Sequence, residues 1–181
     1  MTQRNRSLVL LAIQVVLVLS IAGKYVYERK VCPRVWVPTA QIDPNMPLRG
    51  RYMALQLAMD ACGLPHDGQY LSKGYGTVPG FWEWQVKVVL KDGKLVPVQV
   101  KAAEVRPEQW DRLTQRSGRP CDRATLSQTV DYFIDDRAKT PFPLKPGEEL
   151  WAEVTVPPSG PPRPIQLAVS SEAGFKVLDL R

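Results

Sequence analysis

The chain has 181 residues, of which 44% are hydrophobic, and a formal net charge of +6. This length fits one domain of ordinary size with an accessory segment and makes a second full domain implausible. Arg4 and Arg6 contribute two of the positive charges, so residues 24–181 carry +4. That charge is too mild to indicate nucleic-acid binding.

Residues 7–23 form an uncharged apolar run that follows a short basic tail. As a helix the run would be about 25 Å long, slightly less than the ~30 Å hydrocarbon core of a bilayer. We therefore expect residues 1–23 to be a transmembrane anchor that contacts the lipid bilayer through residues 7–23. The alternative is a signal peptide cleaved near Ala22, because Ser20 and Ala22 are small residues at the spacing that signal peptidase accepts.

Basic residues lie on both sides of the apolar run, so the positive-inside rule favours neither orientation in the membrane strongly. The very short basic tail nevertheless resembles the start of an exported protein. We expect residues 24–33 to be a juxtamembrane linker and residues 34–181 to form a domain outside the cytoplasm.

Three cysteines, Cys32, Cys62 and Cys121, would permit one disulfide in an oxidising compartment and leave one thiol over. Their spacings match neither a zinc site nor a redox pair. Cys62 and Cys121 are the candidate pair, which requires Cα atoms within roughly 7 Å of each other. Buried or incidental thiols are the competing interpretation.

The body is expected to be rich in β-structure, because short runs of β-branched and aromatic residues alternate with turn residues. Residues 52–61 could be strand or helix by propensity alone. The predicted strands are residues 34–38, 81–90, 95–105, 125–134, 150–156, 164–169 and 175–180.

The clearest local prediction is a hairpin, since Asp92-Gly93 lies between two of these runs. Within the first run, Trp82, Trp84 and Val86 share one face with Val88 and Leu90, as a strand packed on one side requires. The second run contains Pro97, which suits an edge or a bulge.

The other segments are interpreted as one helix and three connections. Residues 106–118 have a proline near the start and a closing glycine, which predicts a short helix. Residues 41–50 predict a turn, and the glycine-rich residues 62–79 predict a long exposed loop. Residues 157–164, PPSGPPRP, predict a rigid surface loop rather than a ligand for a proline-binding module.

Motifs for catalysis are sparse. His66 is the only histidine, so a site with two imidazoles cannot be built. An acidic cluster, Asp131, Asp135 and Asp136, could share a proton or hold a cation, but turn residues need no such role. Phosphate-binding glycine motifs are absent. We therefore nominate no catalytic residue, no metal ligand and no cofactor.

Residues 42–57, after an apolar helix and a short strand, resemble the GDYXXLXY family of bacterial proteins. Gly50, Tyr52 and Leu55 occupy the first glycine, the first tyrosine and the leucine of the motif, whereas Arg51 replaces the aspartate and Leu57 the last tyrosine. Farther along the chain, Tyr132-Phe133 looks like the aromatic strand of family members.

The resemblance implies a membrane-anchored protein outside the cytoplasm, often accompanying polytopic membrane proteins, and supplies no catalytic residues. Gly50, Tyr52, Leu55, Tyr132 and Phe133 are interpreted as structural, since a turn and core positions explain the types of Gly50, Tyr52 and Leu55 without a ligand. The expected location is a bacterial inner membrane with the domain in the periplasm, or secretion or a periplasmic location after cleavage.

The predicted fold class is α+β, mainly β: one transmembrane helix, then a compact antiparallel barrel- or sandwich-like domain with one or two short helices. The predicted function is a non-enzymatic binding or assembly module for a membrane or periplasmic partner, such as a polytopic inner-membrane protein. The alternative is an envelope hydrolase that uses Asp131, Asp135 and Asp136 with His66.

Overall fold

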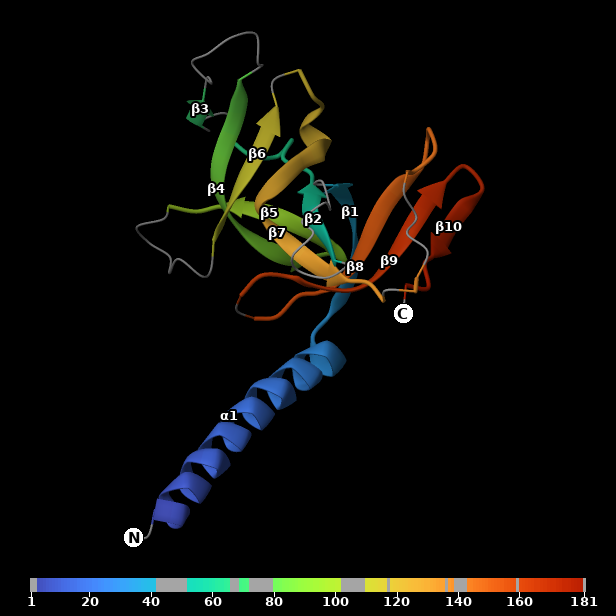
Figure 1. The fold of residues 1–181 in the computed structure, drawn as a ribbon. Helices are drawn as coiled ribbons and strands as arrows, with labels where there is room; N and C mark the ends of the chain where they lie inside the picture. Colours follow the sequence, from blue (N-terminus) through green and yellow to red (C-terminus); the bar gives the residue numbers. More distant parts are fainter. Residues whose placement is uncertain are drawn as a thin grey trace. The chain divides into compact units, whose positions relative to one another are not determined.

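The chain folds into two units, Met1–Pro33 and Arg34–Arg181 (Figure 1). The computed structural model describes residues 3–41, 52–65, 69–71, 80–101, 110–116, 118–135, 137–138, 143–158 and 160–180. The first unit is helical and the second is built from β-strands, so each is described by itself.

The first unit is a single helix, α1 (Gln3–Val31). Its segment Asn5–Val31 has a mean hydropathy of 2.2 in its most apolar part and is long enough to cross a membrane, a property that it shares with signal sequences. Residues 24–31, which we expected in a linker, continue the helix. Lys24 pairs with Glu28 one turn later at 3.7 Å, which supports this extension.

The second unit is a ten-stranded antiparallel sheet, so the prediction of a mainly β fold is confirmed. The order across the sheet is β10-β9-β8-β1-β2-β7-β6-β4-β3, and β5 pairs with β4. The strands are β1 (Arg34–Gln41), β2 (Tyr52–Met59), β3 (Gln69–Leu71), β4 (Phe81–Lys91), β5 (Lys94–Gln99), β6 (Asp111–Arg116), β7 (Ala124–Phe133), β8 (Glu149–Thr155), β9 (Arg163–Ser171) and β10 (Gly174–Val177).

Strand β1 joins the two halves of this sheet. Its residues 34–38 pair with β8, and its residues 39–41 pair with β2. The sheet also curls, because β5 comes back into contact with β1 and β2, and β7 contacts β9. The enclosed core includes Leu55, Leu113 and Leu167, each fully buried.

The predicted hairpin is present as β4 and β5. Asp92 and Gly93 have φ angles of 51° and 72°, which is the left-handed pair that a two-residue hairpin turn needs. Trp84 and Val86 are buried on the predicted core face, with Trp82 packed at its margin. The return strand ends at Gln99 rather than near residue 105.

The predicted helix over residues 106–118 is wrong where the structure describes it, because residues 111–116 form strand β6. Leu113 pairs with Trp84 on one side and with Leu126 on the other, and its side chain is fully buried. A helix there would leave both neighbouring strands without these backbone partners. In the described part of the β unit, helical structure is limited to the 3₁₀ turn η3 (Cys121–Arg123).

Two other predictions changed in part. Residues 52–59 are a strand, which resolves the ambiguity between strand and helix. Residues 69–71, expected in an exposed loop, form β3 and pair with β4. Residues 42–50 of the predicted turn lie outside the described residues.

Candidate functional site

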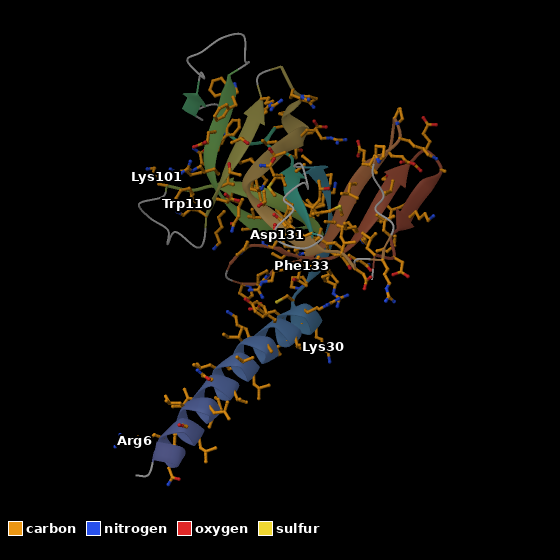
Figure 2. All side chains as sticks on the ribbon, in the orientation of Figure 1. Arg6, Lys30, Lys101, Trp110, Asp131 and Phe133 are labelled. Carbon is orange, nitrogen blue, oxygen red and sulfur yellow. A yellow bond between two sulfur atoms is a disulfide. The ribbon has the colours of Figure 1, made fainter. Side chains whose placement is uncertain are left out.

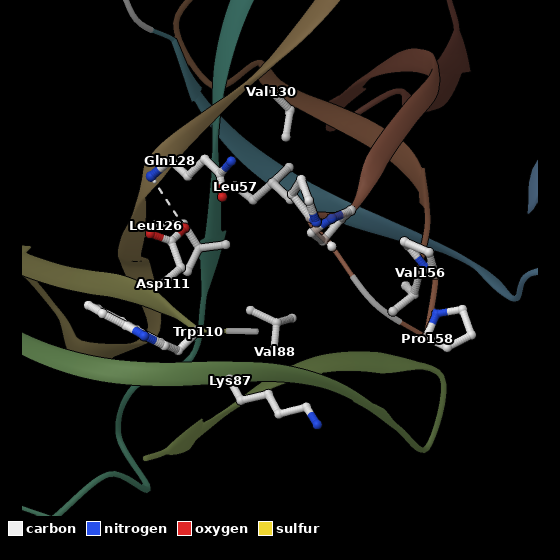
Figure 3. Close-up of a pocket in the computed structure, with 14 residues that line it drawn as sticks. Leu57, Lys87, Val88, Trp110, Asp111, Leu126, Gln128, Val130, Val156 and Pro158 are labelled. Atoms are coloured by element: carbon white, nitrogen blue, oxygen red, sulfur yellow. Dashed lines mark hydrogen bonds between the residues drawn. The ribbon is translucent and has the colours of Figure 1, made fainter. Parts of the chain in front are cut away.

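A pocket of about 70 Å³ lies between the β4–β5 hairpin, the start of β6, the middle of β7 and the loop that joins β8 to β9 (Figure 3). Its walls are mostly apolar and include Leu57, Val88, Leu126, Val130 and Val156. Leu57 is fully buried, so it forms part of the core as well as of the pocket wall.

The proline-rich loop that we predicted to lie at the surface supplies the remaining apolar wall. Pro157, Pro158, Pro161 and Pro162 all line the pocket, together with Gly160. Gly160 has a φ of 89°, a backbone conformation that favours glycine and turns the chain back toward β9. Proline restricts φ, so this wall is stiff before any ligand arrives.

Asp111 places a carboxylate at this mostly apolar site (Figure 3). Its Oδ1 accepts a hydrogen bond from the backbone N–H of Arg112 at 2.7 Å, and its Oδ2 accepts one from that of Gln128 at 3.3 Å. Burial raises the pKa of Asp111, and these hydrogen bonds and the Arg112 charge oppose that rise. The partly buried carboxylate therefore still has lone pairs that can accept further hydrogen bonds.

The position of Asp111 follows from where β6 begins. Val86 of β4 pairs with Asp111, and β6 meets β7 through Leu113 and Leu126. Beyond Asp111 toward the pocket, β4 and β7 continue without a described β6 residue between them. The pocket lies on this side of Asp111, between the described parts of β4 and β7.

The pocket combines apolar walls with a small number of polar groups. Its charged lining residues are Asp111 and the exposed Lys87. Its described lining contains no histidine, cysteine, serine or threonine that could serve as a nucleophile or as its base. The arrangement can bury a small apolar group and hydrogen-bond a donor attached to it.

Asp131 and Asp135, the described members of the acidic cluster in the hydrolase alternative, do not line this pocket. Asp131, which is labelled in Figure 2, is an exposed residue of β7. Asp135 is also exposed, and its Oδ1 accepts a hydrogen bond from Arg137 N at 2.8 Å, which is a turn contact. His66 and Asp136 lie outside the described residues.

The motif residues divide between core and surface. Leu55 is fully buried and Tyr132 is 7% exposed, whereas Tyr52 is half-buried on the opposite face of β2. Phe133 is 75% exposed. Phe133, which is labelled in Figure 2, pairs with Tyr52 across β7 and β2. Their ring centroids are 6.4 Å apart. Gly50 lies outside the described residues.

Cys62 and Cys121 form a disulfide, with Cα atoms 4.9 Å apart. The bond joins the segment after β2 to η3, and Ala61 N donates a hydrogen bond to Cys121 O at 2.9 Å beside it. Cys32, the remaining cysteine, is a free thiol.

Sequence reasoning found the hairpin and the proline loop of this site but missed Trp110, Asp111 and Gln128. The start of β6 was not predicted, because residues 106–118 match the sequence pattern of a short helix. Within the described residues, no group of three or more histidine, cysteine or acidic side chains could hold a metal ion.

Comparison of the chain with protein-family models, curated proteins and solved structures gives no match. The resemblance to the GDYXXLXY family therefore stays a prediction.

Proposed function

We propose that this protein is a single-pass, membrane-anchored binding module of the bacterial cell envelope, with its β unit outside the cytoplasm. Helix α1 supports the anchor by its length and hydropathy. The Cys62–Cys121 disulfide supports an oxidising compartment, because such bonds persist in secreted and periplasmic proteins and are rare in the cytosol. Membership of the GDYXXLXY family is part of the same proposal.

The observation that carries the binding role is the pocket between the β4–β5 hairpin and the proline loop. Its volume of about 70 Å³ is roughly half that of the ~150 Å³ engineered cavity that binds benzene. It therefore suits one small aliphatic side chain rather than a whole metabolite. A side chain presented by another protein is the natural occupant.

The partner is a membrane or periplasmic protein, such as a polytopic inner-membrane protein, that inserts an aliphatic residue against Val88 and Val156. An N–H or ammonium group beside that residue would hydrogen-bond Asp111, whose carboxylate retains acceptor capacity. Such a contact combines an apolar anchor with one polar group that fixes orientation.

The test is affinity purification from gently solubilised membranes, followed by mass spectrometry of the retained proteins and of the chain's own N-terminus. Val88→Arg places a charge in the apolar pocket, and Val98→Arg is its matched control, because Val98 is 45% exposed on the same hairpin and does not line the pocket. We expect Val88→Arg to lower retention of a stoichiometric partner by about 10-fold or more, because the long charged side chain would occupy the space for the partner's aliphatic group.

Equal retention by the two variants would overturn the pocket as the binding site. Recovery of a soluble chain that begins at Gly23, without a partner, would overturn the anchor and favour a secreted protein.

A further inference from the structure

The outer face of the β1–β8–β9–β10 half of the sheet carries an aromatic cluster. The pairing places Trp36 opposite Glu153 and Pro38 opposite Trp151, so these side chains share one face. Phe175 lies opposite Ser170, which itself pairs with Glu149 on that same face. The other face carries Val37, Ala152 and Leu167 and belongs to the core.

The aromatic rings contact one another across the strands. Trp36 and Phe175 have ring centroids 4.8 Å apart, and Trp151 and Phe175 have centroids 6.1 Å apart, both in edge-to-face geometry. Ala168 beneath them is fully buried, yet Phe175 and Val177 are each 49% exposed. We call Trp36, Trp151, Phe175 and Val177 the aromatic face.

The chain tethers this face close to helix α1. That helix ends at Val31 and β1 begins at Arg34, so only Cys32 and Pro33 separate them. Even a fully extended chain allows at most about 17 Å between the Cα atoms of Val31 and Trp36. If α1 spans a bilayer, Trp36 is held within that reach of the end of the anchor.

Basic residues occur on both sides of the short connection between α1 and β1. Arg29 and Lys30 lie in the last turn of α1, and Arg34 and Arg163 both pair with Thr155 at the end of β8. Tryptophan and phenylalanine beside arginine and lysine are the combination that proteins place at a membrane–water interface.

We propose that the aromatic face lies on the lipid surface and inserts Phe175 and Val177 at the headgroup level. This proposal rests on the proposed membrane anchor and goes beyond it, because the anchor requires no second contact with lipid. Lipid is the preferred occupant because the tether holds the face near a bilayer at all times, whereas a protein partner or a second copy must arrive by diffusion.

The test places an environment-sensitive fluorophore on the face of the full-length chain in nanodiscs. Phe175→Cys and Val177→Cys are labelled separately in a Cys32→Ser background, so that the attachment thiol is the only one outside the disulfide. Val98→Cys is the matched control, because Val98 is 45% exposed on a strand distant in sequence from the face. Quenching is measured with lipids brominated on their acyl chains.

We expect labels at 175 and 177 to be quenched about threefold more than the label at 98, because interfacial side chains reach about 5–10 Å into the headgroup and acyl boundary. Equal quenching at all three positions in chains that remain in the nanodisc would overturn the lipid contact and leave the anchor standing. Chains that fail to enter nanodiscs would overturn both proposals. Shielding of 175 and 177 without lipid quenching would indicate a second copy and also overturn the lipid contact.

Discussion

The pocket and the aromatic face are two apolar surfaces of the same β unit, and their shapes suit different partners. The pocket is concave, holds about 70 Å³ and has one partly buried carboxylate, Asp111. The aromatic face is a layer of contacting rings that leaves Phe175 half exposed. A hollow can select one side chain, whereas an open layer of rings suits a broad surface.

The two surfaces also differ in what stabilises them. The disulfide lies on the pocket's half of the sheet, where it links the segment after β2 to the segment before β7. The aromatic face has no described disulfide and depends on strand pairing and ring packing. A substitution directed at one surface should therefore affect that surface more than the other.

The largest expected effect is loss of the disulfide. The double variant Cys62→Ser, Cys121→Ser opens a loop closed over 59 residues, which should lower the free energy of unfolding by about 4 kcal/mol. Hydrogen exchange should accelerate more in β2 and β7 than in β8 and β9, because the bond holds the first pair. Cys32→Ser is the control, and a similar loss of stability for it would contradict this assignment.

The next effect comes from the residue that is both core and pocket wall. Leu57→Ala should destabilise the β unit by about 3 kcal/mol through lost burial and the cavity left behind. Leu167→Ala, equally buried beneath the aromatic face, should cost a similar amount. Urea titration gives the folded fraction of each variant. When retention of the partner is expressed per folded chain, only Leu57→Ala should weaken it. Equal losses of retention would show that stability alone, not the pocket, governs binding.

The smallest effect is electrostatic. Because burial raises the pKa of folded Asp111, the unfolded chain loses its proton first as the pH rises past the ordinary value of 3.8. The folded state then binds more protons than the unfolded state, so stability falls with rising pH until the folded pKa is passed. Asp111→Asn should remove this fall, and the change should be less than about 1 kcal/mol because the group is partly exposed.

Urea unfolding of both chains at several pH values checks this prediction. Asp111→Ala is the control, since it leaves Arg112 N and Gln128 N without their acceptor and should be about 1 kcal/mol less stable than Asp111→Asn. A wild-type chain whose stability rises with pH relative to Asp111→Asn would contradict the sign.

Local sequence predicted the elements whose signals are local. The Asp92-Gly93 turn and the alternation of Trp84 and Val86 were enough to predict the hairpin. The same reasoning failed at residues 111–116, because a proline, acidic residues and two apolar residues three apart also match a short helix. Pairing with β4 and β7 overrode that local preference.

Phe133 illustrates the same limit. Its residue type and its predicted strand did not decide which face of the sheet it occupies, whereas alternation along β7 buries Tyr132 and leaves Phe133 exposed. Neighbouring residues of a strand point to opposite faces of the sheet, so a shift of one residue exchanges the buried and exposed positions. The pairing of β7 with β2 fixes which residues are buried.

The sequence by itself determined that an apolar helix precedes a body of short antiparallel strands, because hydropathy and period are properties of neighbouring residues. Only the tertiary structure decided that Cys62 meets Cys121, that a pocket lies beside Asp111, and that Trp36, Trp151 and Phe175 meet on one face. Each of these joins residues far apart in the chain, and their meeting depends on the register and curl of the whole sheet.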